Sequence, residues 1–277
     1  MTGCINPSDF LRSKGQNVLS RRTHADRRGR ATSDVEIRTF EDVDLKGGTV
    51  VAAFPSVGMV STIATTYLIM RLPVDQVCAL DSADLPALSM IYAKKPKFPA
   101  RVYADRKAKL AIFLCEVPLP GRAMRPIAHA LLRWSQAHGA RQIVTLEGLP
   151  SEALLGEGGP SVWGVGSTDR ARAELDRRKV PQLETGMIAG VSGVLLNEGR
   201  WQSYDVIALL AEARPNQPDA IAAVALTKAL DELLPELEVD LVPLQEQARV
   251  LEEHLRRLKV QARPAVAPET ETGGMYR

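Results

Sequence analysis

Four acidic side chains lie at or just after the ends of apolar, strand-like runs, where α/β proteins commonly place their chemistry. They are Asp81, Asp84, Glu116 and Glu147. Two such carboxyl groups can carry out general acid–base catalysis when burial raises the pKa of one of them. Acidic residues at strand ends also cap helices and pair with arginines, and we expect that structural role here. The acids therefore mark a candidate crevice but identify no reaction.

The serines and glycines that could support catalysis do not complete any known catalytic or phosphate-binding motif. Ser56 and Ser192 lie near glycines, but neither occupies the Gly-x-Ser-x-Gly turn of the α/β hydrolases. Residues 164–168, Gly-Val-Gly-Ser-Thr, precede a charged segment and could hold a phosphate through backbone N–H groups. This segment lacks the lysine of a P-loop and the third glycine of a dinucleotide motif. We predict no catalytic residue and no cofactor.

Histidines and cysteines are few and scattered, which argues against a metal site. None has the spacing of a metal-ligand motif or a Cys-x-x-Cys pair; the residues are His24, His129, His138, His254, Cys4, Cys78 and Cys115. Two of the cysteines lie in apolar runs, which is typical of buried thiols in a reducing compartment. We therefore expect a cytoplasmic protein with no metal and no disulfide framework.

The basic charge of the chain is concentrated at its start. Of the 35 Lys and Arg residues, seven lie in residues 1–33 with only two acidic residues, which leaves 28 basic against 31 acidic residues elsewhere. This arm could bind nucleic acid electrostatically, but its polar composition favours a disordered extension at 1–34, and we do not expect a nucleic-acid partner. No apolar run approaches about 18 residues, so no membrane span is predicted.

The body of the chain alternates strand-like and helix-like segments. Apolar runs at 49–54, 76–80, 109–117, 142–147, 163–165 and 204–211 predict strands, and helical patterns occur at 58–71, 127–138, 169–179, 187–196 and 218–234. Gly186, Gly190 and Gly193 should lie on one face of the 187–196 helix and allow close packing. This alternation predicts a single α/β domain at 35–242, built as a sandwich around a largely parallel sheet.

A separate helix is predicted at 243–262. Its apolar residues form a seven-residue repeat of Leu244, Ala248, Leu251, Leu255, Leu258 and Ala262. Such a seam could pair with another copy of the chain or pack on the chain's own body, and the sequence leaves both open. The last segment, 263–277, has two prolines and two adjacent glycines, so we expect a flexible tail.

The tail ends in Met275, Tyr276 and Arg277, a hydrophobic residue, a tyrosine and a terminal carboxylate. This triplet resembles the docking signal of proteasome activators, whose last residues enter pockets between neighbouring α-subunits of the core particle. The chemistry is suited to such a role, because tyrosine offers ring area and a hydroxyl, and a lysine can pair with the carboxylate.

The body resembles the proteasome assembly chaperone family, of the type called chaperone 2. The resemblance covers roughly residues 48–262 and rests on an ordered set of short segments: Phe54-Pro-Ser-Val-Gly-Met-Val60, Thr65-Thr-Tyr-Leu-Ile69, Pro99-Ala-Arg-Val-Tyr103, Val117-Pro-Leu-Pro120, Leu132-Arg-Trp-Ser135, Leu146-Glu-Gly-Leu-Pro150, Gly186-Met-Ile-Ala-Gly190, Leu195-Leu-Asn-Glu-Gly199, Leu209-Leu-Ala-Glu212 and Pro218-Asp219. The form is similar to the stand-alone proteins of archaea and some bacteria.

The resemblance implies a three-layer α/β fold similar to nucleoside phosphorylases, in a homo-oligomer. It also implies a non-enzymatic protein that assembles the proteasome core or activates it without ATP, or acts as its adaptor. Met275, Tyr276 and Arg277 would then dock between α-subunits. The alternative is a nucleoside-phosphorylase-like or hydrolytic enzyme that uses the crevice at the carboxyl ends of the strands.

Overall fold

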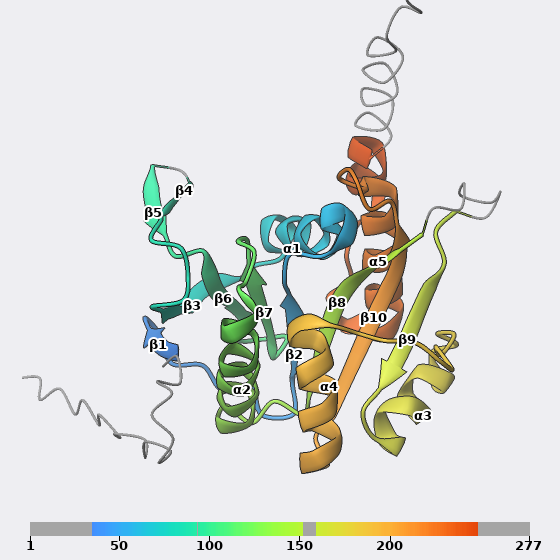
Figure 1. Ribbon diagram of the computed structural model, residues 1–277, viewed down its shortest axis with the longest axis horizontal. Coiled ribbons are helices and arrows are strands. Elements are labelled where there is room, and N and C mark those ends of the chain that lie inside the picture. Colours follow the sequence, from blue (N-terminus) through green and yellow to red (C-terminus); the bar gives the residue numbers. More distant parts are fainter. Residues whose placement is uncertain (1–34, 93, 152–158, 249–277) are drawn as a thin grey trace, which may run out of the picture. The chain divides into compact units, whose positions relative to one another are not determined.

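An eight-stranded mixed sheet is the centre of the computed structural model, which describes residues 35–92, 94–151 and 159–248 (Figure 1). Its strand order is β1-β3-β6-β7-β2-β8-β10-β9. The bounds are β1 Val35–Thr39, β2 Thr49–Ala53, β3 Asp75–Ser82, β6 Ala100–Asp105, β7 Leu110–Cys115, β8 Gln142–Pro150, β9 Val162–Gly166 and β10 Asp205–Ala213. Strands β4 (Met90–Tyr92) and β5 (Lys95–Lys97) form a separate antiparallel pair.

The sheet is parallel in its middle and antiparallel toward both edges. Strands β7, β2, β8 and β10 pair in parallel, whereas β1, β3 and β6 on one side and β9 on the other pair antiparallel. The predicted parallel sheet is therefore present as a four-stranded centre within a mixed sheet. The difference arises at the edges because short connections, such as the turn between β6 and β7, can join only antiparallel neighbours.

Helices cover both faces of the sheet and make three layers. Helices α2 (Gly121–Ala137) and α4 (Gly190–Gln202) pack on one face. Helices α1 (Val60–Arg71), α3 (Asp169–Arg177) and α5 (Ala220–Leu233) pack on the other. The central strands are buried on both faces, and alternate residues of β7 point to opposite layers, with Phe113 toward α2 and Ile112 toward α1. None of the helices that the structure describes is both long and apolar enough to cross a membrane.

Two single-turn helices and a C-terminal segment complete the described chain. They are η2 (Val57–Met59), η3 (Pro235–Leu237) and residues 242–248, which are helical. Leu244 and Ala248, the first two members of the predicted leucine seam, are buried within this chain. The remainder of the predicted 243–262 helix lies outside the described residues, as do the predicted arm at 1–34 and the predicted tail at 263–277.

The helix predicted at 187–196 is misplaced. Residues 186–189 have no regular structure, and α4 begins at Gly190 and continues to Gln202. Gly190 has φ of 73°, a left-handed conformation that separates the helix from the preceding segment. At Gly193 an added Cβ would lie 2.2 Å from the carbonyl oxygen of Ile188, so this glycine allows that segment to fold back on α4. Gly186, Gly190 and Gly193 therefore do not share one helical face.

Candidate functional site

A pocket of about 450 Å³ lies at the carboxyl ends of the neighbouring parallel strands β2 and β8. Residues 54–57 after β2, residues 147–150 of β8, and the segments that lead into α2 and α4 form its walls. The crevice that the α/β pattern predicts is therefore present, at the expected edge of the sheet. Most lining side chains are apolar: Phe54, Val57, Leu119, Met124, Leu149, Met187, Ile188, Val191 and Leu210.

The loop between β2 and α1 forms a fixed wall of this pocket. An added Cβ at Gly148 would lie 2.2 Å from the carbonyl oxygen of Val57, so only glycine allows β8 to pass this close to the loop. The Ser61 hydroxyl donates a hydrogen bond to the carbonyl oxygen of Phe54. The backbone N–H of Asp219 donates to the carbonyl oxygen of Gly58 at 2.8 Å. Hydrogen bonds from α1 and from the residue that precedes α5 thus hold the loop in place.

Glu147 places a carboxyl group in the wall of this apolar pocket. Its Oε1 accepts a hydrogen bond from the hydroxyl of Ser192 at 2.5 Å, and Ser192 Oγ lies 2.5 Å from Thr145 Oγ1. Burial raises the pKa of Glu147 to about 7, and the hydrogen bond from Ser192 offsets part of that rise. Within the described ranges, no arginine, lysine or histidine forms an ion pair with Glu147.

Glu116 lies apart from this pocket in an ion pair with Arg101, and both side chains are almost fully buried. Arg101 also donates from Nε to the hydroxyl of Tyr103 at 3.0 Å and lies 5.2 Å from the centre of the Tyr92 ring. The Tyr92 hydroxyl donates to Glu116. These contacts use both oxygens of Glu116 in a structural network, which is the role expected for it.

The other two candidate acids also pair with arginines. Asp81 Oδ2 lies 2.9 Å from Arg38 Nη2, and Asp84 forms an ion pair with Arg122. The structure therefore does not bring two of the four acids together as an acid–base pair. Glu147 alone among them has no cationic partner within the described residues.

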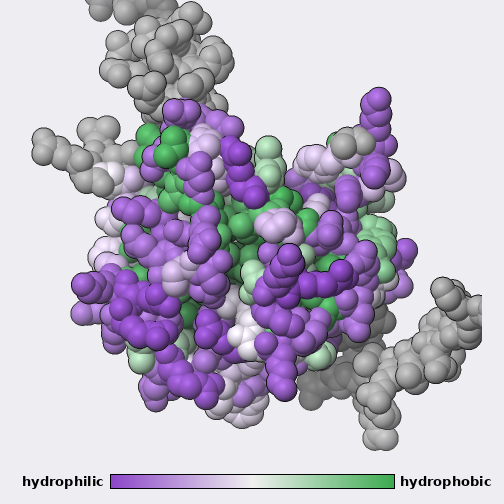
Figure 2. Space-filling model, turned by 180° about the vertical axis from the view of Figure 1, so that it is seen from behind, coloured by the Kyte–Doolittle hydropathy of each residue, from purple (hydrophilic) through white to green (hydrophobic). Residues whose placement is uncertain are grey.

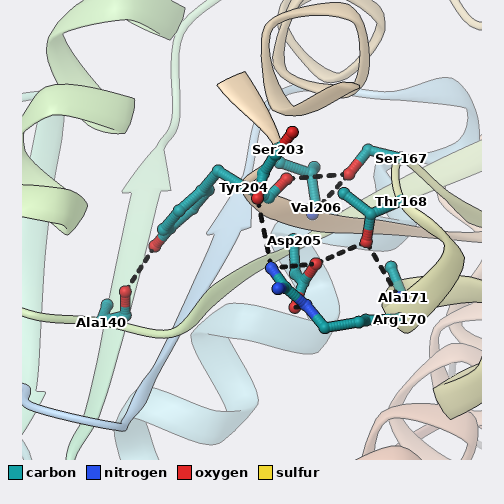
Figure 3. Close-up of polar contacts among 9 residues, drawn as sticks. All are labelled: Ala140, Ser167, Thr168, Arg170, Ala171, Ser203, Tyr204, Asp205 and Val206. Atoms are coloured by element: carbon teal, nitrogen blue, oxygen red, sulfur yellow. Dashed lines mark hydrogen bonds and ion pairs between the residues drawn. The ribbon is translucent and has the colours of Figure 1, made fainter. Parts of the chain in front are cut away.

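The serine and threonine of the Gly-Val-Gly-Ser-Thr segment form hydrogen bonds to other groups of the protein (Figure 3). Thr168 Oγ1 accepts from the backbone N–H of Ala171 at 3.1 Å, which caps α3, and the Thr168 hydroxyl donates to Asp205 Oδ1 at 2.5 Å. Arg170 forms hydrogen bonds to both carboxylate oxygens of Asp205, at 3.1 and 3.2 Å. Ser167 Oγ accepts from the Val206 N–H at 2.8 Å.

The two glycines of this segment are explained by packing. An added Cβ at Gly164 would lie 2.6 Å from a methyl group of Leu175, and one at Gly166 would lie 2.7 Å from the backbone nitrogen of Arg172. Both glycines thus allow α3 to lie directly on β9. The structure thus gives both glycines a packing role.

The serine, histidine and cysteine candidates form no catalytic set in the described part of the chain. Ser192 is fully buried and bonds to Glu147 and Thr145, whereas His129 lies 3.2 Å from Glu198 and His138 Nδ1 lies 2.8 Å from the carbonyl oxygen of Trp134. Cys78 and Cys115 are buried, and burial raises the pKa of their thiols to about 12 and about 11. Both are the buried thiols that the sequence predicts.

The predicted docking residues Met275, Tyr276 and Arg277 lie outside the described residues. The pocket as a unit is not evident from the sequence. Residues 54–57, 147–150 and 187–190 line it together, although they are far apart in the chain. All three stretches belong to the short segments that carry the family resemblance, and this is the one signal that could have pointed to a shared site.

Comparison with known proteins gives one family and several full-length relatives. Residues 50–259 match the PAC2 family. The structure resembles Pyrococcus furiosus PbaA, described as an archaeal homolog of proteasome-assembly chaperone, with 28% identity and a TM-score of 0.74 over 82% of this chain and 92% of that one. It also resembles Pyrococcus furiosus PbaB, described as an archaeal proteasome activator, with 25% identity and a TM-score of 0.70 over 82% and 99%.

A curated sequence relative has no described activity. It is an uncharacterized protein of Methanocaldococcus jannaschii, 22% identical over 234 residues, which cover 84% of this chain and 94% of the relative. All three relatives are matched over nearly their whole length. The similarity therefore concerns the entire fold rather than a shared fragment.

Proposed function

This chain belongs to the PAC2 family, and from that premise we propose that it is a non-enzymatic, cytoplasmic protein that binds the proteasome core particle. The observation that carries the proposal is the likeness to PbaA and PbaB, an assembly-chaperone homolog and a proteasome activator, over 92% and 99% of their chains. Its role would be that of an assembly chaperone or of an ATP-independent activator or adaptor.

The proposed contact is the C-terminal triplet, inserted between neighbouring α-subunits. Met275 would add apolar contact, Tyr276 a buried ring with one hydroxyl hydrogen bond, and Arg277 chiefly its terminal carboxylate. The fifteen residues of the predicted tail can span at most about 50 Å when extended. The triplet could therefore reach a pocket between α-subunits without contact between the body of the protein and that pocket.

We also propose that the protein is a homo-oligomer, because a large apolar side chain is exposed at each end of α1. Residues 60–70 contain no charged side chain, yet Met59 at its start and Met70 near its end are 50% and 75% exposed. Large apolar side chains at the surface can mark a site of contact between proteins. Figure 2 shows hydrophobic residues gathered in the middle of one face between hydrophilic ones. Several copies would present several tails, and avidity can add a factor of about 10²–10⁴.

Light scattering of the full chain at micromolar concentration should give a mass that is a multiple of 30.2 kDa. Replacing Met59 and Met70 with glutamate should shift the mass toward one chain, since charge would be buried in the interface. A mass of one chain for the unmodified protein would contradict the oligomer.

The proposed function is tested by binding to archaeal-type core particles with and without residues 275–277. We expect the full chain to bind and the truncated chain to lose most binding, while thermal unfolding is unchanged because the last residues are predicted to form a flexible tail. A full chain that does not bind would overturn the proposal. Equal binding by both would assign the interaction to the body instead of the tail.

One observation favours the alternative of an enzyme, namely a pocket at the strand ends that contains a carboxyl group without a cationic partner among the described residues. The three-layer arrangement is also the one expected of a fold similar to nucleoside phosphorylases. However, the other three candidate acids are engaged by arginines. Turnover of nucleosides or peptides that Glu147→Gln abolishes would establish the enzyme in place of the binding protein.

A further inference from the structure

We propose that the pocket between β2, β8 and α4 binds a small hydrophobic amine, with the Glu147 carboxylate as the acceptor of its ammonium group. This ligand site lies on the body of the protein and is independent of the proposed docking of the tail.

The size and lining of the pocket suit a small apolar molecule. Its volume of about 450 Å³ falls within the usual 300–1,000 Å³ of small-molecule sites. Side chains such as Phe54, Met124 and Leu149 would bury hydrocarbon, and the wall near Val57 is held rigidly by the close approach of Gly148. A preformed pocket of this kind reduces the ordering cost of binding.

The hydrogen bonds of Ser192 and Thr145 favour the ionised form of Glu147, which can only accept hydrogen bonds. Ser192 has one hydroxyl hydrogen and donates it to Glu147 Oε1. Thr145 must then donate to Ser192, since the two hydroxyl oxygens lie 2.5 Å apart and both side chains are fully buried. This chain of two donors ends on the carboxyl group and stabilises its ionised form. One carboxylate oxygen is then engaged by Ser192, and the other has no protein partner among the described residues.

The charge of the site selects a cation over other ligands. Glu147 is the one ionisable side chain among the described residues that line the pocket, and no described cation pairs with it. A carboxylate in an apolar wall is unfavourable unless it is paired, and an ammonium group supplies both the opposite charge and hydrogen-bond donors. A carboxylate or phosphate ligand would instead meet a like charge without a compensating cation.

The same chemistry could come from a free amine or from the N-terminus of a peptide that begins with a hydrophobic residue. Both present an ammonium group next to an apolar side chain. The test therefore needs one probe of each kind, together with a neutral analogue of each.

Calorimetric titration of the full chain with 2-phenylethylamine and with 2-phenylethanol tests the free amine. We expect saturable binding of the amine to be about 10- to 100-fold tighter than that of the alcohol, because it adds a charge-assisted hydrogen bond. Glu147→Gln should remove this difference while keeping weak binding of the alcohol. The matched control Glu232→Gln, on the exposed side of α5, should bind like the unmodified chain.

The pH dependence gives a second readout. The pKa of Glu147 is raised to about 7, so its carboxylate is mostly protonated at pH 6 and mostly ionised at pH 8. An alkylammonium group stays charged over this range. Amine affinity should therefore rise about tenfold from pH 6 to pH 8, and Glu147→Gln should flatten that profile.

A tripeptide Leu-Ala-Ala and its N-acetylated form distinguish the two sources. Binding of the free tripeptide but not the acetylated one would assign the pocket to peptide N-termini, and binding of 2-phenylethylamine alone would assign it to free amines. Absence of saturable binding by either probe, or equal amine affinity in a folded Glu147→Gln variant, would overturn the proposal. Neither outcome bears on proteasome binding, which is measured with the tail.

Discussion

Replacing Tyr276 with alanine should remove most of the binding to the proteasome core particle. A buried aromatic anchor at the centre of an interface commonly contributes about 2 kcal/mol or more, so we expect a loss of roughly 30-fold per tail. In an oligomer the loss should be larger, because each tail of the assembly carries the same change. Surface-immobilised core particles and purified full chain give the affinity directly.

Two further variants separate the tyrosine from the terminal carboxylate. Arg277→Ala keeps a free carboxylate at the same position and should be mild. Residues appended after Arg277 move the carboxylate away and should weaken binding about as much as Tyr276→Ala. Binding that is indifferent to both Tyr276→Ala and a C-terminal tag would show that the triplet does not dock.

Replacing Asp219 with alanine should strongly destabilise the fold. Asp219 is fully buried at the start of α5 and accepts from the Ala222 N–H at 3.1 Å and from Arg214 Nε and Nη2 at 2.8 and 2.9 Å. Its removal takes away a helix cap and leaves the partly buried Arg214 without this carboxylate, at a cost of about 3 kcal/mol. The melting temperature should fall by roughly 6–12 °C.

The pH dependence of this loss follows from the pKa of Asp219. Burial raises the pKa of Asp219, but hydrogen bonds from Arg214 and Ala222, together with the charge of Arg214, outweigh burial and hold that pKa below its usual value. The ionised carboxylate therefore stabilises the fold at pH values above the unfolded pKa of about 4, and this contribution disappears as pH falls through the folded pKa. The gap between unmodified chain and Asp219→Ala should be constant from pH 5 to 8 and should narrow below pH 4.

Thr168→Ala is the comparison variant, because the uncharged Thr168 caps α3 with the same type of bond to Ala171, although its hydroxyl also donates to Asp205. We expect Thr168→Ala to lower the free energy of unfolding by about 1 kcal/mol, which is less than the loss in Asp219→Ala at pH 7. Thermal and urea unfolding measure both variants. An Asp219→Ala loss no larger than that of Thr168→Ala would mean that the Arg214 pair adds nothing to stability.

The central strands and most helices can be predicted directly from local patterns in the sequence. Strands β2, β7, β8 and β10 are apolar runs because parallel strands are covered on both faces, and burial of that kind leaves a continuous signal. Asp219 marks the start of α5 because a side-chain acceptor satisfies free N–H groups there. Only short-range patterns are needed for these elements.

The antiparallel side of the sheet that contains β6 leaves a weaker signal in the sequence. The sequence pattern does not predict strand β6, which contains Arg101 and Tyr103, polar residues that suggest an exposed segment. Arg101 is nevertheless buried because Glu116, which follows the neighbouring strand β7, neutralises it. That pairing depends on strand order, which the local pattern of β6 does not contain.

The two candidate sites depend on different levels of structure. The terminal triplet is contiguous, so Met275, Tyr276 and Arg277 can be recognised from the sequence without knowledge of the fold. In the pocket, Glu147 comes from β8, Ser192 from α4 and the facing wall from the loop after β2. Glu116 pairs with an arginine, whereas Glu147 contacts a hydroxyl group. The segments that pack beside each carboxyl group decide this difference, because its charge environment and burial arise from neighbours in space rather than in sequence.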